Sequence, residues 1–393
     1  MSPSLTIVAN KNTPYVIETF DHLGKIVALE TREVTREAVR DADILIVRSE
    51  TKVGKDLLEG SRVRFVGTVT IGTDHVDLEY LKKQNIAFAS APGSNSQSVA
   101  EYVTSALCVL ARRKNASLSG KTLGVVGVGN VGSKVVNIAR ALGMNVLEND
   151  PPRFREAGDR KFVSLDELMG ADIISLHVPL TKSGQDATYH LFDEKRLGRM
   201  KRGAVLVNTS RGPVIEPPAL KQMLETGHLS AAILDVWEGE PSVDTGLLQS
   251  VFLGTPHIAG YSLEGKVNAV QMIYEALCSY LSVPALRRAQ SFLPRIASGP
   301  VSISVRSLEE ALLQAMRPFY DIEQDDRQLR EIIAVPQQEH AAYFMRLRAN
   351  YRVRREFVNG AVSLSSSSGQ VEQALKALRF NVTSPKQVES WTR

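Results

Sequence analysis

Short apolar segments alternate with helix-like stretches through the first 280 residues of the chain. This alternation is typical of βα units arranged around a parallel sheet, so the predicted class is α/β. The first predicted strands are Leu5 to Ala9, Ile44 to Arg48, Arg64 to Val69 and Ile86 to Ala89. Thr13-Pro14 predicts the start of a helix, because Thr is a good N-cap and Pro fits the first helical position. Helical segments are also expected near Asp56 and over Asp77 to Gln84.

A long helical pattern from Ser98 to Arg113 leads into a second series of strands and helices. The predicted strands of this series are Thr122 to Val126, Asn145 to Glu148, Ile173 to His177, Ala204 to Asn208 and Ala231 to Val236. The helix-like stretch Glu264 to Tyr280 is long enough to return to the first series and pack on it. The second series would then be an insertion in the first.

The pattern changes beyond Val283, where shorter elements follow one another. Ser307 and Glu310 have the spacing of a capping box and predict the start of a helix. The other predicted elements are a strand over Val301 to Val305, a basic helix near Phe344 to Phe357, a strand over Ala361 to Ser365 and a helix over Val371 to Leu378. These residues predict a third, α+β domain.

Composition and charge narrow the class of partner. The 393 residues carry 47 basic and 43 acidic side chains, which gives a net charge of +4. This balance of charges does not favour sequence-independent binding to nucleic acid. The two cysteines, Cys108 and Cys278, lie in apolar stretches with no metal-ligand spacing, so no metal site is expected. No apolar run reaches about 18 residues, and the start of the chain lacks the pattern of a signal peptide. A cytoplasmic protein with no membrane partner is therefore expected, acting on a small anionic metabolite.

A glycine motif opens the second series of strands. Gly127-Val-Gly129-Asn-Val-Gly132 directly follows the strand Leu123 to Val126 and opens a helix that runs to Leu142. In this context the first glycine permits a tight turn, the second lets backbone approach a pyrophosphate, and the third allows close helix–strand packing. The helix N-terminus then offers free N–H groups to the phosphates. The motif predicts a dinucleotide site.

Asp150 ends the next predicted strand, 18 residues after Gly132. An acidic side chain there can accept hydrogen bonds from both adenosine ribose hydroxyls and would repel a 2′-phosphate. This favours NAD over NADP, although Arg153 and Arg155 lie close in sequence and leave NADP open.

Three further motifs follow predicted strands and predict hydride-transfer chemistry. They are Asn208-Thr-Ser-Arg211-Gly212, Asp235-Val-Trp-Glu-Gly-Glu240-Pro241 and Thr255-Pro-His257-Ile-Ala-Gly260-Tyr261. Arg211 suits a substrate carboxylate, because a guanidinium forms two parallel hydrogen bonds to it. His257 suits the proton of a hydroxyl, because imidazole accepts and returns protons near neutral pH. Glu240 would fix the tautomer of His257 and stabilise the imidazolium.

These motifs resemble the D-isomer-specific 2-hydroxyacid dehydrogenase family, in which Arg, Glu and His occur in this order. Further matching runs are Phe65-Val-Gly-Thr-Val-Thr70-Ile-Gly-Thr-Asp-His75-Val-Asp77, Ala91-Pro-Gly-Ser-Asn95, Asp150-Pro-Pro-Arg153 and His257-Ile-Ala-Gly-Tyr261-Ser-Leu-Glu-Gly-Lys266. The resemblance implies that Ser49, Thr70 and Tyr261 contact substrate. It implies NAD contacts at Asn130, Val131, Asp150, Val178, Thr209, Ser210, Asp235 and Gly260, in addition to Gly127, Gly129 and Gly132.

The resemblance also implies the domain organisation: two Rossmann-like, doubly wound parallel-sheet domains plus a C-terminal α+β dimerisation domain. Residues 1–98 and 258–283 would bind substrate, 99–257 would bind NAD, and 284–393 would form a homodimer. The implied activity is NAD-dependent oxidation of a small phosphorylated 2-hydroxy acid in pyridoxal phosphate biosynthesis. Two alternatives remain: a dehydrogenase for another acid, such as phosphoglycerate or glycerate, and a non-catalytic NAD-sensing protein on the same fold.

Two groups of arginines are candidates for the substrate phosphate. Arg48 stands beside Ser49 at the end of a predicted strand. A second group, on the predicted tail helix, comprises Arg346, Arg348, Arg352, Arg354 and Arg355. In a dimer this second group would reach the partner's site, or it would form a solvated face with ordinary ion pairs.

Overall fold

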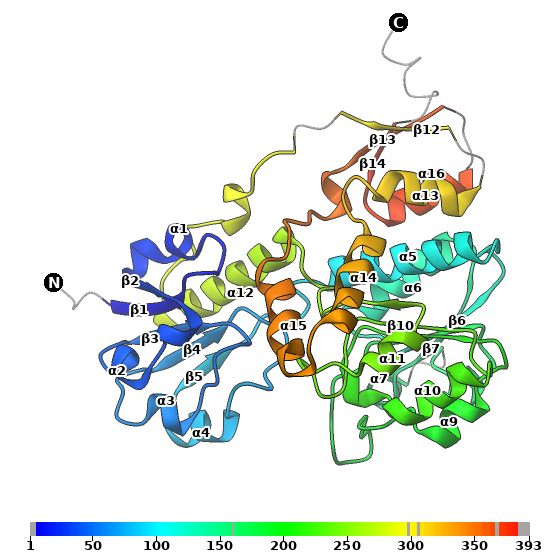
Figure 1. Ribbon diagram of the computed structural model, residues 1–393. Helices are drawn as coiled ribbons and strands as arrows, with labels where there is room; N and C mark the ends of the chain where they lie inside the picture. The colour runs from blue at the N-terminus through cyan, green and yellow to red at the C-terminus, as the bar shows by residue number, and fades with distance from the viewer. Residues whose placement is uncertain (1–4, 159–160, 297–298, 305–306, 366–368, 384–393) are drawn as a thin grey trace, which may run out of the picture. The chain divides into compact units, whose positions relative to one another are not determined.

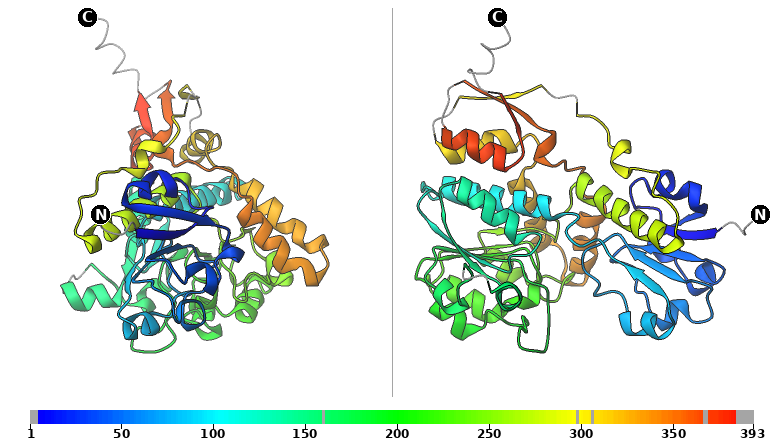
Figure 2. Two further views of the ribbon diagram at one scale, coloured as in Figure 1. Left: turned by 90° about the vertical axis from the view of Figure 1, so that its left-hand side faces the viewer. Right: turned by 180° about the vertical axis from the view of Figure 1, so that it is seen from behind.

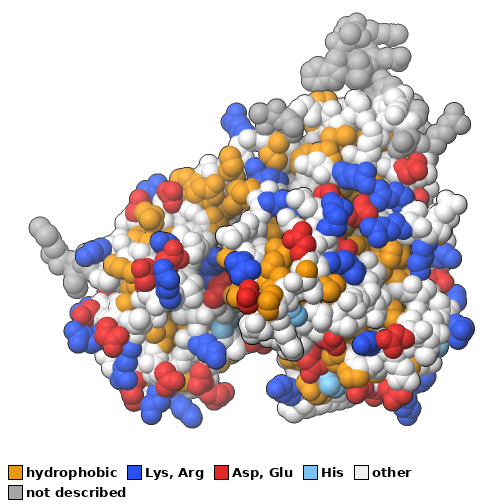
Figure 3. All heavy atoms as spheres, in the orientation of Figure 1, with side chains coloured by type: hydrophobic (Ala, Val, Ile, Leu, Met, Phe, Trp, Pro, Cys, Tyr) orange, Lys and Arg blue, Asp and Glu red, His pale blue; other side chains and the backbone are white. Residues whose placement is uncertain are grey.

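The computed structural model describes residues 5–158, 161–296, 299–304, 307–365 and 369–383 (Figure 1). Contacts within the chain define two units. One comprises Met1–Asn95 and Tyr261–Arg295, and the other comprises Ser96–Gly260 and Ile296–Arg393. Acidic and basic side chains are interspersed over the face seen in Figure 3, as the nearly balanced charge leads one to expect.

The first unit is built on a five-stranded parallel sheet in the order β2-β1-β3-β4-β5. Its strands are β1 (Leu5–Asn10), β2 (Gly24–Leu29), β3 (Ile44–Val47), β4 (Phe65–Thr68) and β5 (Ala87–Ala89). Its helices are α1 (Val16–Phe20), α2 (Arg36–Val39), α3 (Lys55–Leu58), α4 (Leu78–Lys83) and α12 (Leu263–Leu281). The predicted long helix after residue 263 is confirmed, and it belongs to the same unit as the first strands.

Both faces of this sheet are covered, which explains why β3 is apolar throughout. Ile7 and Ile46 belong to a buried cluster with α1 and α12. Val8 and Leu45, which point the other way, belong to a second cluster with α2, α3 and α4. The side chains therefore alternate between two apolar layers along each strand.

The start of the first helix was predicted wrongly. Helix α1 begins at Val16, after Tyr15 with φ 56°, and not at Thr13-Pro14. The Thr13 N–H donates to the carbonyl of Asn10 at 3.0 Å and the Val16 N–H to the carbonyl of Thr13 at 3.4 Å, so these residues form the turn that follows β1. Strand β2 was also missed; it is an edge strand whose residues are only partly buried.

The second unit contains a six-stranded parallel sheet in the order β11-β10-β9-β8-β6-β7. Its strands are β6 (Thr122–Val126), β7 (Asn145–Asn149), β8 (Ile173–Leu176), β9 (Val205–Asn208), β10 (Ala231–Leu234) and β11 (Leu253–Gly254). Its helices are α5 (Ser96–Arg113), α6 (Gly132–Ala141), α7 (Pro151–Ala157), α8 (Leu165–Leu168), α9 (Glu194–Arg199), α10 (Pro217–Glu225) and α11 (Thr245–Ser250). The strand order reverses at β6, between β8 and β7, which is where such sheets bind ligands. The predicted doubly wound sheets are confirmed.

The same unit carries a small C-terminal sheet of β12 (Val301–Ile303), β13 (Ala361–Leu364) and β14 (Asn381–Thr383). The accompanying helices are α13 (Leu308–Met316), α14 (Ile322–Arg330), α15 (His340–Ala349) and α16 (Gly369–Ala377). Helices α13 and α16 lie between this sheet and helices α5 and α6 (Figure 2). As predicted, Ser307 caps α13 by accepting the N–H of Glu310 at 3.2 Å. The end of the predicted strand at Val305 lies outside the described residues.

The predicted basic helix over Phe344 to Phe357 is wrong beyond Ala349, where α15 ends. Arg352, Arg354 and Arg355 therefore lie in the irregular segment that follows the helix, so the five arginines do not form one helical face. Arg352 pairs with the carboxylate of Asp325, as expected for an ordinary ion pair. Arg354 is fully buried within its own chain and belongs to no solvated face.

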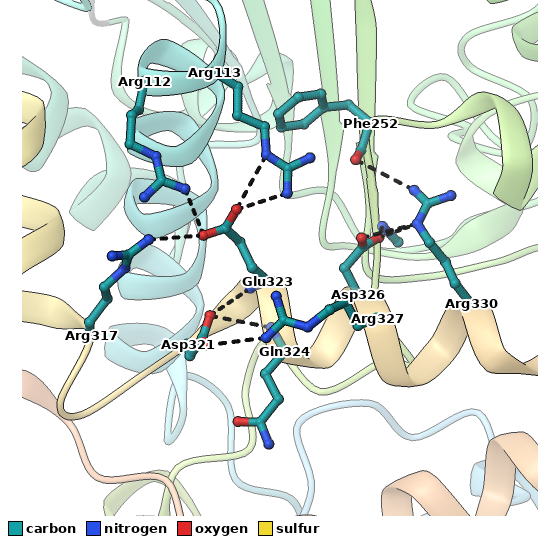
Figure 4. Close-up of polar contacts among 11 residues, drawn as sticks. Arg112, Arg113, Phe252, Arg317, Asp321, Glu323, Gln324, Asp326, Arg327 and Arg330 are labelled. Atoms are coloured by element: carbon teal, nitrogen blue, oxygen red, sulfur yellow. Dashed lines mark hydrogen bonds and ion pairs between the residues drawn. The ribbon is translucent and has the colours of Figure 1, made fainter.

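Helix α14, which was also missed, is anchored to α5 by a buried acid (Figure 4). Glu323 accepts hydrogen bonds from Arg112 at 2.7 Å, from Arg113 at 2.8 Å and from Arg317 at 3.2 Å. Burial alone would raise the pKa of Glu323, but the hydrogen bonds from Arg113 and Arg112 lower it to about 2. One turn further, Asp326 accepts the N–H of Gly254 at the end of β11.

Replacing Glu323 with glutamine should destabilise the protein by about 2 kcal/mol at pH 7, because three arginines lose their common anion. A carboxylate whose pKa is depressed on folding stabilises the protein above its unfolded pKa. The contribution should therefore be lost as pH falls from about 4 to about 2. Thermal unfolding should show a lower midpoint for E323Q than for the wild type at pH 7, with the difference closing near pH 2. The exposed variant E339Q is the matched control. An equal loss of stability in both variants would show that the contacts of Glu323 with the three arginines do not stabilise the fold.

Candidate functional site

The glycine motif has the geometry that each of its glycines was predicted to allow. Gly127 has φ +85°, and a Cβ there would meet the carbonyl oxygen of His177 at 2.7 Å. A Cβ on Gly132 would lie 2.0 Å from the carbonyl oxygen of Gly127, so α6 packs directly on the turn. A Cβ on Gly129 would meet nothing within 4 Å. The middle glycine thus leaves open space before the N-terminus of α6, as a bound pyrophosphate requires.

Asp150 follows β7 and is fixed by the same turn. Its Oδ2 accepts the N–H of Val128 at 2.8 Å, and its Oδ1 accepts the N–H of Arg153 at 3.2 Å as the N-cap of α7. The Arg153 guanidinium donates to the carbonyl of Val128, and Arg155 pairs with Asp186. Both basic residues that left NADP open are thus held by groups of the protein. The Asp150 carboxylate is the acidic group from which a preference for NAD was predicted.

The other predicted cofactor residues follow the carboxyl ends of neighbouring strands in the same sheet. Asn130 and Val131 lie in the glycine loop. Val178 follows β8, Thr209 and Ser210 follow β9, Asp235 follows β10, and Gly260 lies in the segment after β11. Because the strands are parallel, these positions lie along one edge of the sheet, in the same unit as Gly127.

His177 was not predicted from the sequence, although it lies within this edge. Its Nε2 lies 2.9 Å from Ser175 Oγ and its Nδ1 lies 3.2 Å from Thr209 Oγ1. Burial lowers the pKa of His177 to about 3, so the imidazole is neutral at pH 7. A polar residue directly after the predicted strand residues 173–176 was the signal that could have found it. Its side chain contacts Thr209, and its carbonyl oxygen borders the turn at Gly127.

His257 and Glu240 form a close pair. His257 Nδ1 lies 2.5 Å from Glu240 Oε1, and both side chains are partly exposed. Burial raises the pKa of Glu240, but the charge and hydrogen bond of His257, together with the charge of Arg348, outweigh it. The net effect lowers the pKa, so Glu240 is ionised at pH 7 and holds a proton on Nδ1 of the imidazole. The other ring nitrogen, Nε2, is then left to exchange a proton.

Asp235 holds the backbone on which His257 is mounted. Its carboxylate accepts the N–H of Ile258 at 2.8 Å and of Ala259 at 2.9 Å, and its carbonyl accepts the N–H of His257 at 2.7 Å. Thr255 Oγ1 donates to the same carboxylate at 2.6 Å. His257 itself has φ +57°, which a non-glycine residue seldom adopts without such support. Asp235 thus acts on the loop that presents the imidazole.

Arg211 lies just beyond β9, next to the segment that leads to Glu240. Asn208 Nδ2 donates to the Arg211 carbonyl at 2.9 Å, and the Arg211 guanidinium donates to the Ser210 carbonyl at 2.8 Å. A Cβ on Gly212 would lie 2.0 Å from the backbone of Trp237. The backbone after Arg211 therefore lies against the backbone three residues before Glu240, and both belong to the unit that carries the glycine loop.

The predicted substrate residues belong to the other unit. Ser49 follows β3, and Thr70 follows β4, where its Oγ1 lies 2.8 Å from Thr68 Oγ1. Tyr261 precedes α12, and the ammonium of Lys266 lies 4.8 Å from the centre of its ring. Lys266 was quoted in the family motif but was given no role from the sequence. Burial, and secondly the charge of Arg48, lower the pKa of Lys266 to about 8.

No three His, Cys, Asp or Glu side chains in the described ranges come together in a way that could hold a metal ion. No helix in the described part of the chain has the length and apolarity that crossing a membrane requires.

Comparison with known proteins places these features in a family. Residues 94–259 match the model of the D-isomer specific 2-hydroxyacid dehydrogenase, NAD binding domain, and residues 292–378 match a domain of unknown function, DUF3410. The erythronate-4-phosphate dehydrogenase of Pseudomonas savastanoi pv. phaseolicola is 45% identical over 95% of this chain and 99% of its own length. The one of Salinibacter ruber is 45% identical over 95% of this chain and 97% of its own length.

Solved structures agree with the fold. The TT0316 protein from Thermus thermophilus is 27% identical with a TM-score of 0.62, over 72% of this chain and 99% of that chain. The D-lactate dehydrogenase from Aquifex aeolicus, complexed with NAD and lactic acid, is 28% identical with a TM-score of 0.59, over 70% and 95%. Fold and site together define an NAD-dependent dehydrogenase. Within that class, the chain belongs to the erythronate-4-phosphate dehydrogenases of the D-isomer-specific 2-hydroxyacid dehydrogenase family.

Proposed function

We propose that the protein oxidises the 2-hydroxyl of 4-phospho-D-erythronate with NAD, yielding (R)-3-hydroxy-2-oxo-4-phosphobutanoate for pyridoxal 5′-phosphate biosynthesis. The observation that carries the chemistry is the 2.5 Å contact between His257 Nδ1 and Glu240 Oε1, because an oriented imidazole is what removal of a hydroxyl proton requires. The relatives that carry this substrate in their name match the chain almost from end to end.

In this reaction His257 Nε2 takes the proton of the 2-hydroxyl, and the Glu240 carboxylate stabilises the imidazolium that forms. Arg211 holds the substrate carboxylate through two parallel hydrogen bonds, which fixes the adjacent carbon. NAD, when bound, would supply the acceptor for the hydride of that carbon. The proton on the imidazole is then released to solvent, which completes the balance of the reaction.

The cofactor would be held by the edge of the six-stranded sheet. The open space at Gly129 and the N-terminus of α6 fit a pyrophosphate, and the carboxylate of Asp150 fits ribose hydroxyls. The remaining proposed contacts are Gly127, Asn130, Val131, Gly132, Val178, Thr209, Ser210, Asp235 and Gly260. Ser49, Thr70 and Tyr261 are the proposed substrate contacts from the other unit.

The substrate phosphate would bind to Arg48 and Lys266. Arg48 donates to the Asn12 carbonyl and lies 3.6 Å from the Glu50 carboxylate, so its guanidinium is oriented. Burial, and after it the charge of Arg48, lower the pKa of Lys266, while the charge of Glu50 raises it. Two cations held together in a half-buried setting favour an anion between them, because its charge relieves their repulsion.

Replacing Arg48 or Lys266 with methionine should raise KM for 4-phospho-D-erythronate by about 10- to 100-fold, the cost of one or two charge-assisted hydrogen bonds. KM for D-erythronate, which lacks the phosphate, should change by less than about threefold. Steady-state kinetics with both acids test this, and the exposed variant K52M is the control. Equal effects on both acids would remove the two residues from the phosphate site.

We also propose the three-part organisation and the assembly state. Residues 1–98 with 258–283 would bind substrate, 99–257 would bind NAD, and 284–393 would join two copies into a homodimer. A cytoplasmic location is consistent with Cys108 and Cys278, which are both free and buried thiols. Light scattering on the purified chain tests the dimer, and a monomer at micromolar concentration would contradict it.

The identity of the substrate is tested by measuring the rate of NADH formation with 4-phospho-D-erythronate, 3-phospho-D-glycerate and D-glycerate in parallel. Product is followed directly in companion assays that contain a 2-oxo acid as acceptor. A clear preference for 4-phospho-D-erythronate is the expected result. Preference for another acid would keep the mechanism and change the substrate, whereas bound NAD without turnover of any acid would favour an NAD-sensing protein.

A further inference from the structure

The segment after α15 buries an arginine and exposes its apolar neighbour. Arg354 is 1% exposed as a whole residue, whereas Val353 beside it is 73% exposed. Burying a guanidinium is costly unless its donors are used, so a fully buried arginine marks a place where its hydrogen bonds matter. Those bonds go to main chain of the same unit, far away in the sequence.

Two backbone carbonyls receive the donors of Arg354. Its Nη1 donates to the Ala259 carbonyl at 2.9 Å, and its Nη2 donates to the Ser98 carbonyl at 2.7 Å. Ser98 lies in the first turn of α5, two residues after the unit begins at Ser96. Ala259 is the residue before Gly260, where this stretch of the unit ends. One planar guanidinium therefore ties together the two points at which the chain enters and leaves this part of the second unit.

The side chain of Arg354 is itself held on several sides. The centre of its guanidinium lies 3.8 Å from the centre of the Tyr320 ring. Its Nη2 lies 3.8 Å from Glu101 Oε2, and the other oxygen of Glu101 accepts the N–H of Phe357 at 3.0 Å. Ser98 Oγ donates to Glu356 at 3.0 Å. The C-terminal segment is thereby locked into the core, so the guanidinium has little freedom to follow a moving loop.

Ala259 connects Arg354 to the loop that carries His257. Its N–H donates to Asp235, its carbonyl accepts from Arg354, and it lies two residues after His257. With both sides of the residue fixed, the backbone that gives His257 its positive φ has few alternatives. Asp235 acts on this loop from the NAD-binding sheet, and Arg354 acts on it from the C-terminal region that matches the domain of unknown function.

We propose that Arg354 is a positioning residue for His257: its guanidinium fixes the Ala259 carbonyl against the start of α5, so the C-terminal region sets the presentation of the acid–base group. This inference rests on the proposed role of His257. It gives residues 292–378 a task within their own chain, in addition to any part in assembly.

The test compares Arg354→Lys with Arg352→Lys. A lysine keeps the positive charge but lacks the planar fork that reaches two carbonyls at once. Arg352 is the matched control: its hydrogen bonds within the described part of the chain go to Asp325 and to the Asp321 carbonyl, and not to Ser98 or Ala259. Hydrogen–deuterium exchange of residues 255–260 is measured without substrate, and kcat, KM and the Kd of NAD are measured with 4-phospho-D-erythronate.

In R354K the amides of Ile258 and Ala259 should exchange about 10-fold faster than in the wild type. The value of kcat should fall about 10-fold. KM and the Kd of NAD should stay within about twofold of wild type. R352K should change neither quantity. Unchanged exchange in R354K, or equal changes in R352K, would overturn the inference. If R354K does not fold, R354Q is measured instead, with the same expectations. Wild-type protein without activity on this acid would contradict the proposed function, while the exchange result would still decide the role of Arg354.

Discussion

Replacing His257 with asparagine is expected to lower kcat by about 10²- to 10⁴-fold, the contribution of a positioned general base. The amide of asparagine can donate to Glu240 in place of the ring Nδ1–H. The hydrogen bond to Glu240 can therefore persist while Nε2, the proton acceptor, is lost. The Kd of NAD should stay within about twofold, because the glycine loop and Asp150 follow other strands of the sheet, β6 and β7. Steady-state kinetics and a fluorescence titration with NAD measure the two quantities.

Comparing the companion variant Glu240→Gln with H257N distinguishes the contribution of the group that orients the imidazole from that of the proton acceptor itself. Glutamine can still accept a hydrogen bond from His257 Nδ1, but it carries no charge to stabilise the imidazolium. The loss of kcat for hydroxyl oxidation should therefore be smaller than in H257N, because the imidazole that accepts the proton is still present. An H257N enzyme that keeps more than a tenth of wild-type kcat would show that another group takes the proton.

Replacing Arg211 with methionine is expected to lower kcat/KM by about 10²- to 10³-fold, because two charge-assisted hydrogen bonds to the substrate carboxylate are lost. Arg211→Lys should recover only part of this loss, since an ammonium keeps the charge but not the fork. The exposed variant R202M is the control for a change of net charge. If R211K were as active as wild type, the charge alone would matter and the bidentate geometry would be excluded.

The strands and the glycine motif could be predicted because their signals are local. Buried parallel strands are short apolar runs, and GxGxxG reflects the steric needs of a turn. Strand β2 was missed because it lies at the edge of its sheet and buries its residues only in part. Helix α1 begins later than Thr13-Pro14 predicts, because those residues form the turn after β1. In both cases the tertiary position of the segment, which propensity cannot give, decided the structure.

The candidate site could be predicted from the sequence where a polar motif directly follows a predicted strand. The pair His257–Glu240 was expected from the sequence, and the structure gives its two atoms a distance of 2.5 Å. Arg354 could not be found in this way, because a basic residue in a run of arginines usually lies in solvent. Its burial depends on carbonyls at Ser98 and Ala259, which are far from it along the chain. Contacts of that kind carry no signal in a single sequence.

In the proposed reaction, hydride leaves the carbon bearing the 2-hydroxyl of 4-phospho-D-erythronate and is transferred to NAD. This transfer is tested most directly by a single turnover of 4-phospho-D-erythronate deuterated at that carbon, with the nucleotide and the acid analysed by mass spectrometry. We expect one deuterium in the reduced nucleotide and a 2-oxo acid that has lost it. Unlabelled NADH, or deuterium that stays on the acid while NADH forms, would show that the hydride does not come from this carbon.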